Sequence, residues 1–185
     1  EKTCNDVVIE ISGVSNNFFI DQSDVLRIIR NFVGGNAQGR TILTFNLAAI
    51  ESNLEKEVWI KNAELFFDNN EVLRVSIDER EPIARVFSFS GNSFYIDSSL
   101  KVLPLSDKFS ARLPVFTGFT HDPAFLSKAD SSLLASIKEI SMALQADSFL
   151  MAMIEQVDIT PQRSFEMIPK IGNQLIVFGE ADDVA

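Results

Sequence analysis

Cysteine and histidine are almost missing from the chain, which has one of each, Cys4 and His121, in 185 residues. A single cysteine cannot form an intramolecular disulfide, and we expect Cys4 to be a free thiol near a frayed terminus. Most zinc sites and nucleophilic triads need a histidine beside a partner, and no motif surrounds His121. The sequence therefore predicts a surface-loop histidine and gives no catalytic residue, no metal ligand and no cofactor site.

Positive charge is also scarce, since 16 Lys and Arg stand against 26 Asp and Glu, a net charge of −10. Such a surface repels phosphate, so we expect no nucleic-acid partner. No apolar run approaches the ~18–20 residues needed to cross a bilayer. Hydrophobic residues make up 46% of the chain, with 16 Phe, so one or two domains have core material without disulfides.

Apolar residues in the first part of the chain alternate, then recur at helical spacing, then alternate again. The expected elements are a strand over Val7–Val14, a helix between a cap at Asp21 or Ser23 and a stop at Gly34, a helix capped by Asn46, and strands over Ala63–Phe67 and Leu73–Ile77. The order β-α-α-β-β predicts a three-stranded sheet with two helices on one face.

The rest of the chain favours short strands around one long helix. The expected elements are strands at 84–89, 93–96, 102–103 and 115–116, a helix capped by Asp130 or Ser131, a further turn or two at 149–154, and strands at 157–159, 164–168 and 174–178. We therefore expect an α+β protein whose second domain is mostly antiparallel β with one or two helices.

A charged segment that ends in proline separates these two parts, and proline has no N–H to give to a central strand. We interpret Glu79, Arg80, Pro82 and Ala84 as the joint between a domain over 1–81 and a domain over 82–185.

Three patterns could indicate a functional site, but each is more typical of a structural role. Gly34–Thr41 fits a phosphate-binding loop apart from Arg40, yet a helix precedes the glycines where a strand is needed, so a flexible connection is expected. Asp97 at a hairpin corner is expected to bond its own backbone. Trp59 opens a strand and is expected to be a buried aromatic.

Short strands leave sheet edges, and an exposed edge recruits extended peptides. The last expected strand is the candidate docking edge, formed by Gln174, Leu175, Ile176, Val177 and Phe178. The acidic residues from Glu180 onward are typical of the first turn of a helix, so the natural protein is expected to continue.

Four motifs follow one another in a fixed order. They are Val58-Trp59-Ile60-Lys61-Asn62-Ala63, Leu73–Ala84 with the pattern L-x-[IV]-x-[IV]-x-E-x-x-P-[IV]-A, Phe94-Tyr95-Ile96-Asp97 with Val102-Leu103, and Leu113-Pro114-Val115-Phe116-Thr117-Gly118. Together they resemble the bacterial FtsQ/DivIB family, although Glu57 and Leu100 stand where proline and glycine are common in the family.

This resemblance implies a POTRA domain followed by a β domain, in the periplasm, behind a single inner-membrane helix that precedes Glu1. It implies a non-enzymatic divisome scaffold that links early and late division proteins, docks the FtsB–FtsL pair largely by strand addition, and regulates septal peptidoglycan synthesis. The family's final helix and strand follow the position of Gly179 and are missing here, so no contact residue is carried over.

Two alternatives stay open. A POTRA-containing outer-membrane assembly or secretion component would also act by strand addition, usually with tandem POTRA domains. A small-molecule binding or hydrolytic domain would require a deep pocket lined by convergent polar groups.

Overall fold

The computed structural model describes residues 2–13, 19–108 and 110–180. The chain divides into two units, Glu1–Glu81 and Pro82–Ala185, and each is described by itself. No helix within the described residues is both long and apolar enough to cross a membrane.

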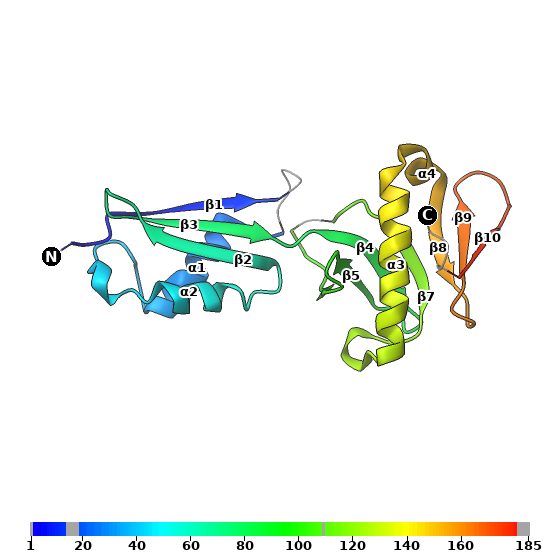
Figure 1. Ribbon diagram of the computed structural model, residues 1–185, viewed down its shortest axis with the longest axis horizontal. Helices are drawn as coiled ribbons and strands as arrows, with labels where there is room; N and C mark the ends of the chain where they lie inside the picture. The colour runs from blue at the N-terminus through cyan, green and yellow to red at the C-terminus, as the bar shows by residue number, and fades with distance from the viewer. Residues whose placement is uncertain (1, 14–18, 109, 181–185) are drawn as a thin grey trace. The chain divides into compact units, whose positions relative to one another are not determined.

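The first unit is a three-stranded sheet with both of its α-helices on one face (Figure 1). Its elements are β1 (Asp6–Ser12), α1 (Gln22–Val33), a short 3-10 helix η1 (Ile42–Thr44), α2 (Leu47–Leu54), β2 (Ile60–Phe67) and β3 (Val72–Glu79). β3 lies in the middle, parallel to β1 and antiparallel to β2. The predicted β-α-α-β-β order is confirmed.

Local sequence sets the ends of these helices. The Asp21 side chain accepts a hydrogen bond from the N–H of Asp24 at 2.9 Å, and Asp24 accepts one from the N–H of Asp21 at 3.2 Å. This reciprocal capping box starts α1, and Gly34 ends it in the left-handed conformation, with φ of 72°. Asn46 accepts from the N–H of Ala49 at 3.1 Å and starts α2, as predicted.

Residues 2–5 are held in place by main-chain hydrogen bonds, so the expectation of a frayed terminus at Cys4 is wrong. Cys4 is 1% exposed, its N–H donates to the carbonyl of Arg40 at 2.8 Å, and its carbonyl accepts from Gly39 at 2.8 Å. Burial raises the pKa of its thiol. The same bonds, with Arg40 donating to the carbonyl of Gly34 at 3.0 Å, tie down the segment that was expected to be a flexible connection.

The second unit is a seven-stranded sheet in the order β10-β9-β8-β7-β4-β5-β6. Its elements are β4 (Pro82–Ser88), β5 (Ser93–Asp97), β6 (Val102–Leu103), β7 (Val115–Phe119), a 3-10 helix η2 (Pro123–Phe125), α3 (Lys128–Ala146), α4 (Ser148–Met153), β8 (Ile154–Ile159), β9 (Phe165–Pro169) and β10 (Ile176–Gly179). β7 is parallel to both of its neighbours, and the other pairs are antiparallel. The predicted mostly antiparallel sheet with two helices, and with it the α+β class, is confirmed.

β7 joins two meanders, β4-β5-β6 on one side and β8-β9-β10 on the other. Gly118 in β7 has φ of 81°, and a Cβ there would lie 2.5 Å from the carbonyl oxygen of Ile159 in β8. Any other residue would strain the backbone and push the two strands apart. This is the physical reason for glycine at the end of the Leu113–Gly118 motif.

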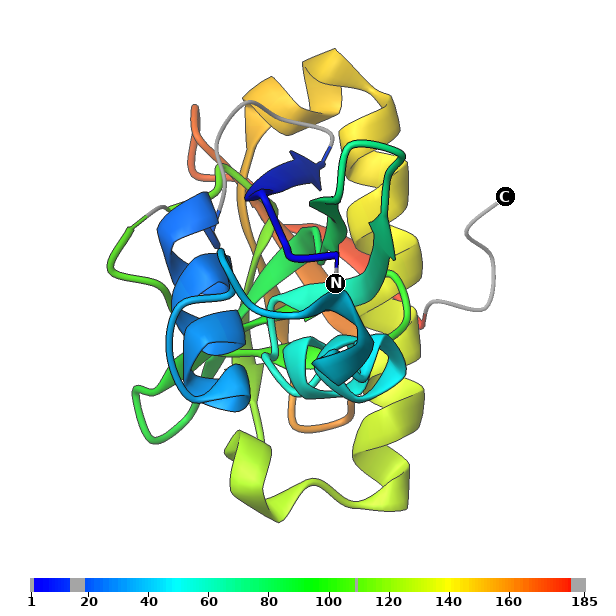
Figure 2. The ribbon, with the colours of Figure 1, turned by 90° about the vertical axis from the view of Figure 1, so that its left-hand side faces the viewer.

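α3 runs lengthwise beside this sheet, with α4 at its end, as Figure 2 shows in yellow. The core between them is mostly aromatic and aliphatic. It contains Ala84, Val86, Phe94, Ile96, Phe116, Phe119, Val157, Ile159, Phe165 and Met167 from the strands and Leu133, Leu134, Ile137, Ile140 and Leu144 from α3. The hydroxyl of Ser141 also donates to the carbonyl of Ile83 at 2.6 Å, which fixes α3 on β4.

Two ends in this unit differ from the expectation. The N-cap of α3 is Ser127, not Asp130 or Ser131, because the Ser127–Asp130 pair forms a capping box. The last strand is Ile176–Gly179, so Gln174 and Leu175 precede it. The helix start expected from Glu180 onward lies almost entirely in residues 181–185, outside the described residues.

Candidate docking site

β10 forms one edge of the second sheet and has β9 as its strand neighbour within the described residues. Ile176 lies opposite Met167 and Val177 opposite Glu166, and the register shifts before Gly179. Met167 belongs to the core under α3, whereas Glu166 does not. Cross-strand partners share a face, so Ile176 and Val177 point to opposite faces of the sheet.

The apolar side chains of this segment are unusually open to solvent. Leu175 is 52% exposed, Ile176 43%, Val177 72% and Phe178 36%. Exposure on both faces shows that α3 does not extend over this strand. Of the residues predicted to form the docking edge, Ile176, Val177 and Phe178 thus lie in the strand, while Gln174 and Leu175 precede it.

α4 also carries exposed apolar residues. Phe149 is 65% exposed, and Leu150 and Met153 are each 37% exposed. Asp147 starts α4 by accepting from the N–H groups of the first two of these residues, at 2.8 and 3.2 Å. The carbonyl of Met153 accepts from the N–H of Lys170 at 2.8 Å, which places the end of α4 beside the β9–β10 connection.

The β8–β9 hairpin, whose second strand pairs with β10, is fixed to α3 through a buried carboxylate. Asp130 is 0% exposed, and its oxygens contact His121 Nδ1 at 3.0 Å and Arg163 Nη2 at 3.3 Å. The hydroxyl and N–H of Ser127 donate to the same carboxylate at 2.6 and 2.7 Å. Arg163 lies in the β8–β9 turn and also donates to the carbonyl of Ala129 at 2.7 Å. We call this group the Asp130 clamp.

The charge of Asp130 is sustained by these partners. Burial alone raises the pKa of the carboxyl, but the hydrogen bonds from Ser127 and the contact with His121 outweigh it, so the pKa lies below its usual range. His121 is therefore half exposed in a loop, as predicted, yet it is also paired with a buried group.

The residues interpreted as a joint have separate structural tasks. Glu79 is the last residue of β3 and is buried, and its carboxylate accepts from the N–H groups of Phe19 and of Ile20, the latter at 3.3 Å. Burial raises the pKa of Glu79, the two N–H groups pull it partly back, and Glu81 adds to the rise.

The other three residues of the predicted joint each have a defined place in one of the two units. The N–H of Arg80 donates to the carbonyl of Trp59 at 2.8 Å. Pro82 is the first residue of β4, opposite Asp97 of β5, and Ala84 is fully buried in the core of the second unit. The edge residues and the joint residues are thus distinct features, and the structure does not gather them into one site.

Asp97 and Trp59, which were predicted to have structural roles, make the expected contacts. Asp97 accepts from the N–H groups of Ser99 and Lys101 at 2.9 and 2.8 Å, which confirms that it bonds its own hairpin. Trp59 is 6% exposed and stacks on Phe19, with ring centroids 4.0 Å apart, which confirms a buried aromatic. Within the described residues, no group of three or more His, Cys, Asp or Glu could hold a metal ion.

Three features escaped the sequence reasoning, although two left a signal. The Ser127-x-x-Asp130 spacing is that of a capping box and marks the true start of α3. Glu79 continues the alternation of Leu73 and the apolar residues after it, which points to the buried face. The exposure of α4 has no signal, because an apolar run such as 149–154 reads equally well as core.

These elements define a class of protein: a POTRA-like β-α-α-β-β unit followed by a larger, mostly antiparallel β unit in which β10 is an edge strand of the described sheet. Residues 2–78 match the family model described as a POTRA-like domain, and residues 81–185 match the one described as FtsQ/DivIB, C-terminal related. The chain belongs to this FtsQ/DivIB-related family of cell-division scaffolds, as its motifs indicated. No curated protein matches the chain.

Proposed function

We propose that this chain is the periplasmic part of a non-enzymatic divisome scaffold whose second unit docks an FtsB–FtsL-type pair by strand addition to β10. The observation that carries the proposal is the open edge at Ile176–Gly179, whose three large side chains are all exposed. An edge strand offers unpaired main-chain groups, and apolar side chains beside them supply pockets for a partner strand.

The exposed residues of α4 support the same location. Eight of the sixteen large hydrophobic residues that are exposed in the described chain lie at 149–178. A monomer rarely exposes apolar residues so densely unless a partner covers them. We propose that the partner, once added as a strand, also covers Phe149 and Met153.

A lysine in the strand tests the proposal. Val177 is 72% exposed, so Val177→Lys leaves the core intact but places a charge that opposes strand pairing. The matched control is Leu43→Lys in the first unit, where the residue is 89% exposed.

Calorimetric titration with the periplasmic parts of the FtsB–FtsL pair should give at least ~tenfold weaker binding for Val177→Lys, a change of ~1.4 kcal/mol. The Leu43→Lys control should bind like the wild type. Equal affinities for both variants would contradict docking at β10.

The family match also supports a membrane-anchored periplasmic placement, and we propose a single inner-membrane helix ahead of this region. Alkaline phosphatase fused to the C-terminal end of the full-length protein should be active, since this enzyme folds only in the periplasm. An inactive fusion that is expressed at the same level would contradict the orientation.

We propose that Glu79, Arg80, Pro82 and Ala84 act as the joint, because β3 ends at the first of them and β4 begins at Pro82. Two glycines inserted after Glu81 should leave the urea midpoint of the first unit unchanged, as reported by fluorescence of Trp59, the sole tryptophan. A lowered midpoint would show that the segment is part of that unit's fold rather than a joint.

The other functions considered have less support. The match of residues 81–185 favours a division scaffold over an outer-membrane assembly component. A pocket beside Arg112 holds about 80 Å³. Ordinary small-molecule sites hold ~300 Å³ or more and are lined mainly by apolar side chains. A hollow of about 520 Å³ at the end of α1 is large enough, but Arg30, Asn31, Gly34, Gly35 and Asn36 line it and supply no apolar side chain. Neither pocket therefore favours a small-molecule or hydrolytic function.

A further inference from the structure

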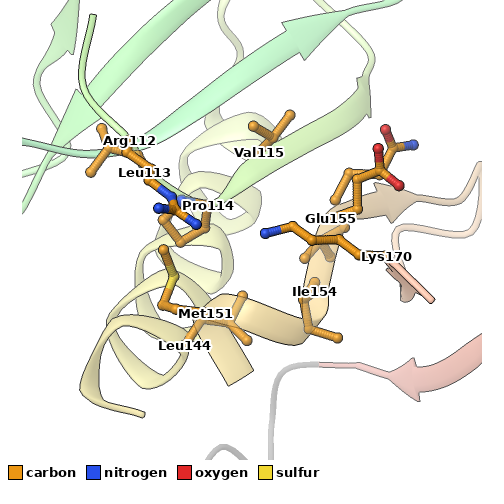
Figure 3. Close-up of a pocket in the computed structure, with 11 residues that line it drawn as sticks. Arg112, Leu113, Pro114, Val115, Leu144, Met151, Ile154, Glu155 and Lys170 are labelled. Atoms are coloured by element: carbon orange, nitrogen blue, oxygen red, sulfur yellow. The ribbon is translucent and has the colours of Figure 1, made fainter. Parts of the chain in front are cut away.

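A small pocket opens in the second unit at the beginning of β7, away from β10. It holds about 80 Å³ and lies between the C-terminal end of α3, α4 and the start of β8 (Figure 3). Its apolar walls are Leu113, Pro114, Val115, Leu144, Met151, Ile154 and Val157. A cavity of ~150 Å³ accepts benzene, so this one has room for about one aliphatic side chain.

Two cations stand at the mouth of this pocket. Arg112 and Lys170 both line it, and in Figure 3 their charged ends extend toward each other across the opening. Within the described residues, neither forms an ion pair. Glu155 also lines the pocket but is paired with neither cation, so the mouth carries a net positive charge in a chain of net charge −10.

A second hollow in this unit is also lined by a cation, but that cation is already ion-paired. Arg163 lines a wider hollow of about 200 Å³ beside α3, but its guanidinium is already bound to Asp130 and to the carbonyl of Ala129. The charge of Arg163 is thus already paired with a carboxylate of the chain itself. Arg112 and Lys170 have no such partner within the described residues.

Main-chain bonds hold the walls of the pocket in position. The carbonyl of Pro114 accepts from the N–H of Arg85 at 3.0 Å, and the N–H of Lys170 donates to Met153 at 2.8 Å. Both sides of the mouth are therefore anchored to regular elements, β4 and α4. A pre-formed pocket loses little conformational entropy when a ligand enters.

We propose that this pocket binds a short acidic peptide segment of a partner protein, with one aliphatic side chain inside and flanking carboxylates at Arg112 and Lys170. The inference rests on the proposed docking function but uses a different surface, since no residue of β10 lines the pocket. The volume is too small for a nucleotide base with its sugar, whereas an aliphatic side chain beside Asp or Glu matches both the walls and the charge.

Methionine methyl signals provide a direct readout. The chain has 4 methionines, of which Met151 lines the pocket and Met142, 47% exposed on α3, does not. The probe is the peptide acetyl-Ala-Asp-Leu-Glu-Ala-amide, and its matched control is acetyl-Ala-Asn-Leu-Gln-Ala-amide. Titrated into the full 185-residue chain labelled with 13C in its methionine methyl groups, the acidic peptide should shift Met151 in a saturable way and leave Met142 unchanged.

Charge substitutions at the mouth then test the assignment. Both cations are exposed, so the double variant Arg112→Gln/Lys170→Gln should fold normally and bind the acidic peptide about tenfold more weakly, as two exposed ion pairs allow. Glu155→Gln should bind it about twofold more tightly, because a repulsive carboxylate is removed. Equal binding of the acidic and amide peptides, or unchanged binding by the double variant, would overturn the proposal.

Failure here is distinguishable from failure of the proposed function. Val177→Lys should leave the peptide-induced shift of Met151 unchanged, because β10 does not line the pocket. If Val177→Lys abolishes that shift, the peptide adds to the sheet edge and the pocket proposal is wrong. If the peptide produces no shift while the FtsB–FtsL pair still binds, the pocket proposal alone fails.

Discussion

The two edges of the seven-stranded sheet are built in opposite ways. β6 is two residues long, its Leu103 is fully buried, and its Val102 packs against the core. β10 has four residues, and Val177 in it is 72% exposed. A short edge strand tied into the core offers little backbone to a partner, whereas an exposed apolar strand invites one. The difference supports the proposal that a partner docks at the β10 side rather than at the β6 side.

Alanine substitutions at the two edges should differ most in their effect on the free energy of unfolding. Leu103→Ala leaves a cavity in the core and should lower the free energy of unfolding by ~2–5 kcal/mol. Leu175→Ala, at a residue 52% exposed, should change it by no more than ~0.5 kcal/mol. Urea unfolding followed by circular dichroism measures both, and similar losses would show that the edges are equally integrated.

The Asp130 clamp belongs to the β10 side, because Arg163 in the β8–β9 turn is one of its members. Asp130→Asn removes a buried charge that several donors stabilise, and should cost ~2 kcal/mol. Glu139→Gln, an exposed carboxylate-to-amide change on α3, is the matched control and should stay within ~0.5 kcal/mol. An equal response of both variants in the same urea assay would show that the clamp is dispensable.

An open edge should also pair with itself when no partner is present. We expect weak self-association of the chain through β10, and Val177→Lys should weaken it by about tenfold. Sedimentation equilibrium over a range of concentrations measures this, with Leu43→Lys as the exposed control. A control variant that weakens association as much as Val177→Lys would place the contact elsewhere.

The smallest effect should be a pH dependence of the clamp. The pKa of Asp130 is lower in the folded protein than in the unfolded chain. The ionised Asp130 side chain therefore contributes its full stabilisation above the unfolded pKa of ~3.9, and this stabilisation is lost as pH falls through the lower, folded pKa. The stability difference between wild type and Asp130→Asn should therefore be constant above pH ~5 and shrink below pH ~4. A difference that persists unchanged into acid would contradict the ionised clamp.

The sequence predicted elements whose causes are local. Asp21, Asn46 and Gly34 mark helix ends by their own chemistry, and the alternation of β3 is visible in its residues. What escaped prediction depends on distant partners. Cys4 is ordered because the backbone near Arg40 pairs with it, and nothing in residues 1–5 reveals this.

The candidate site also has features that local sequence predicts and features that depend on distant residues. The terminal strand and its apolar character were predicted from residues 174–178, but the exposure of Ile176, on the face that α3 covers elsewhere, depends on how far α3 reaches across the sheet. The pocket at Arg112 and Lys170 was not predicted, because its walls come from three stretches that are separated in sequence, 112–115, 144–157 and Lys170. Short-range patterns locate strands and caps, and only packing decides which surface is left open.

Hydrogen exchange of backbone amides tests strand addition at β10 most directly. Adding saturating FtsB–FtsL pair to the chain should slow exchange at Ile176–Gly179, because new main-chain bonds form there, while exchange at Val102 and Leu103 of β6 stays the same. Protection that appears at β6, or binding that leaves β10 amides unprotected, would contradict docking at the open edge.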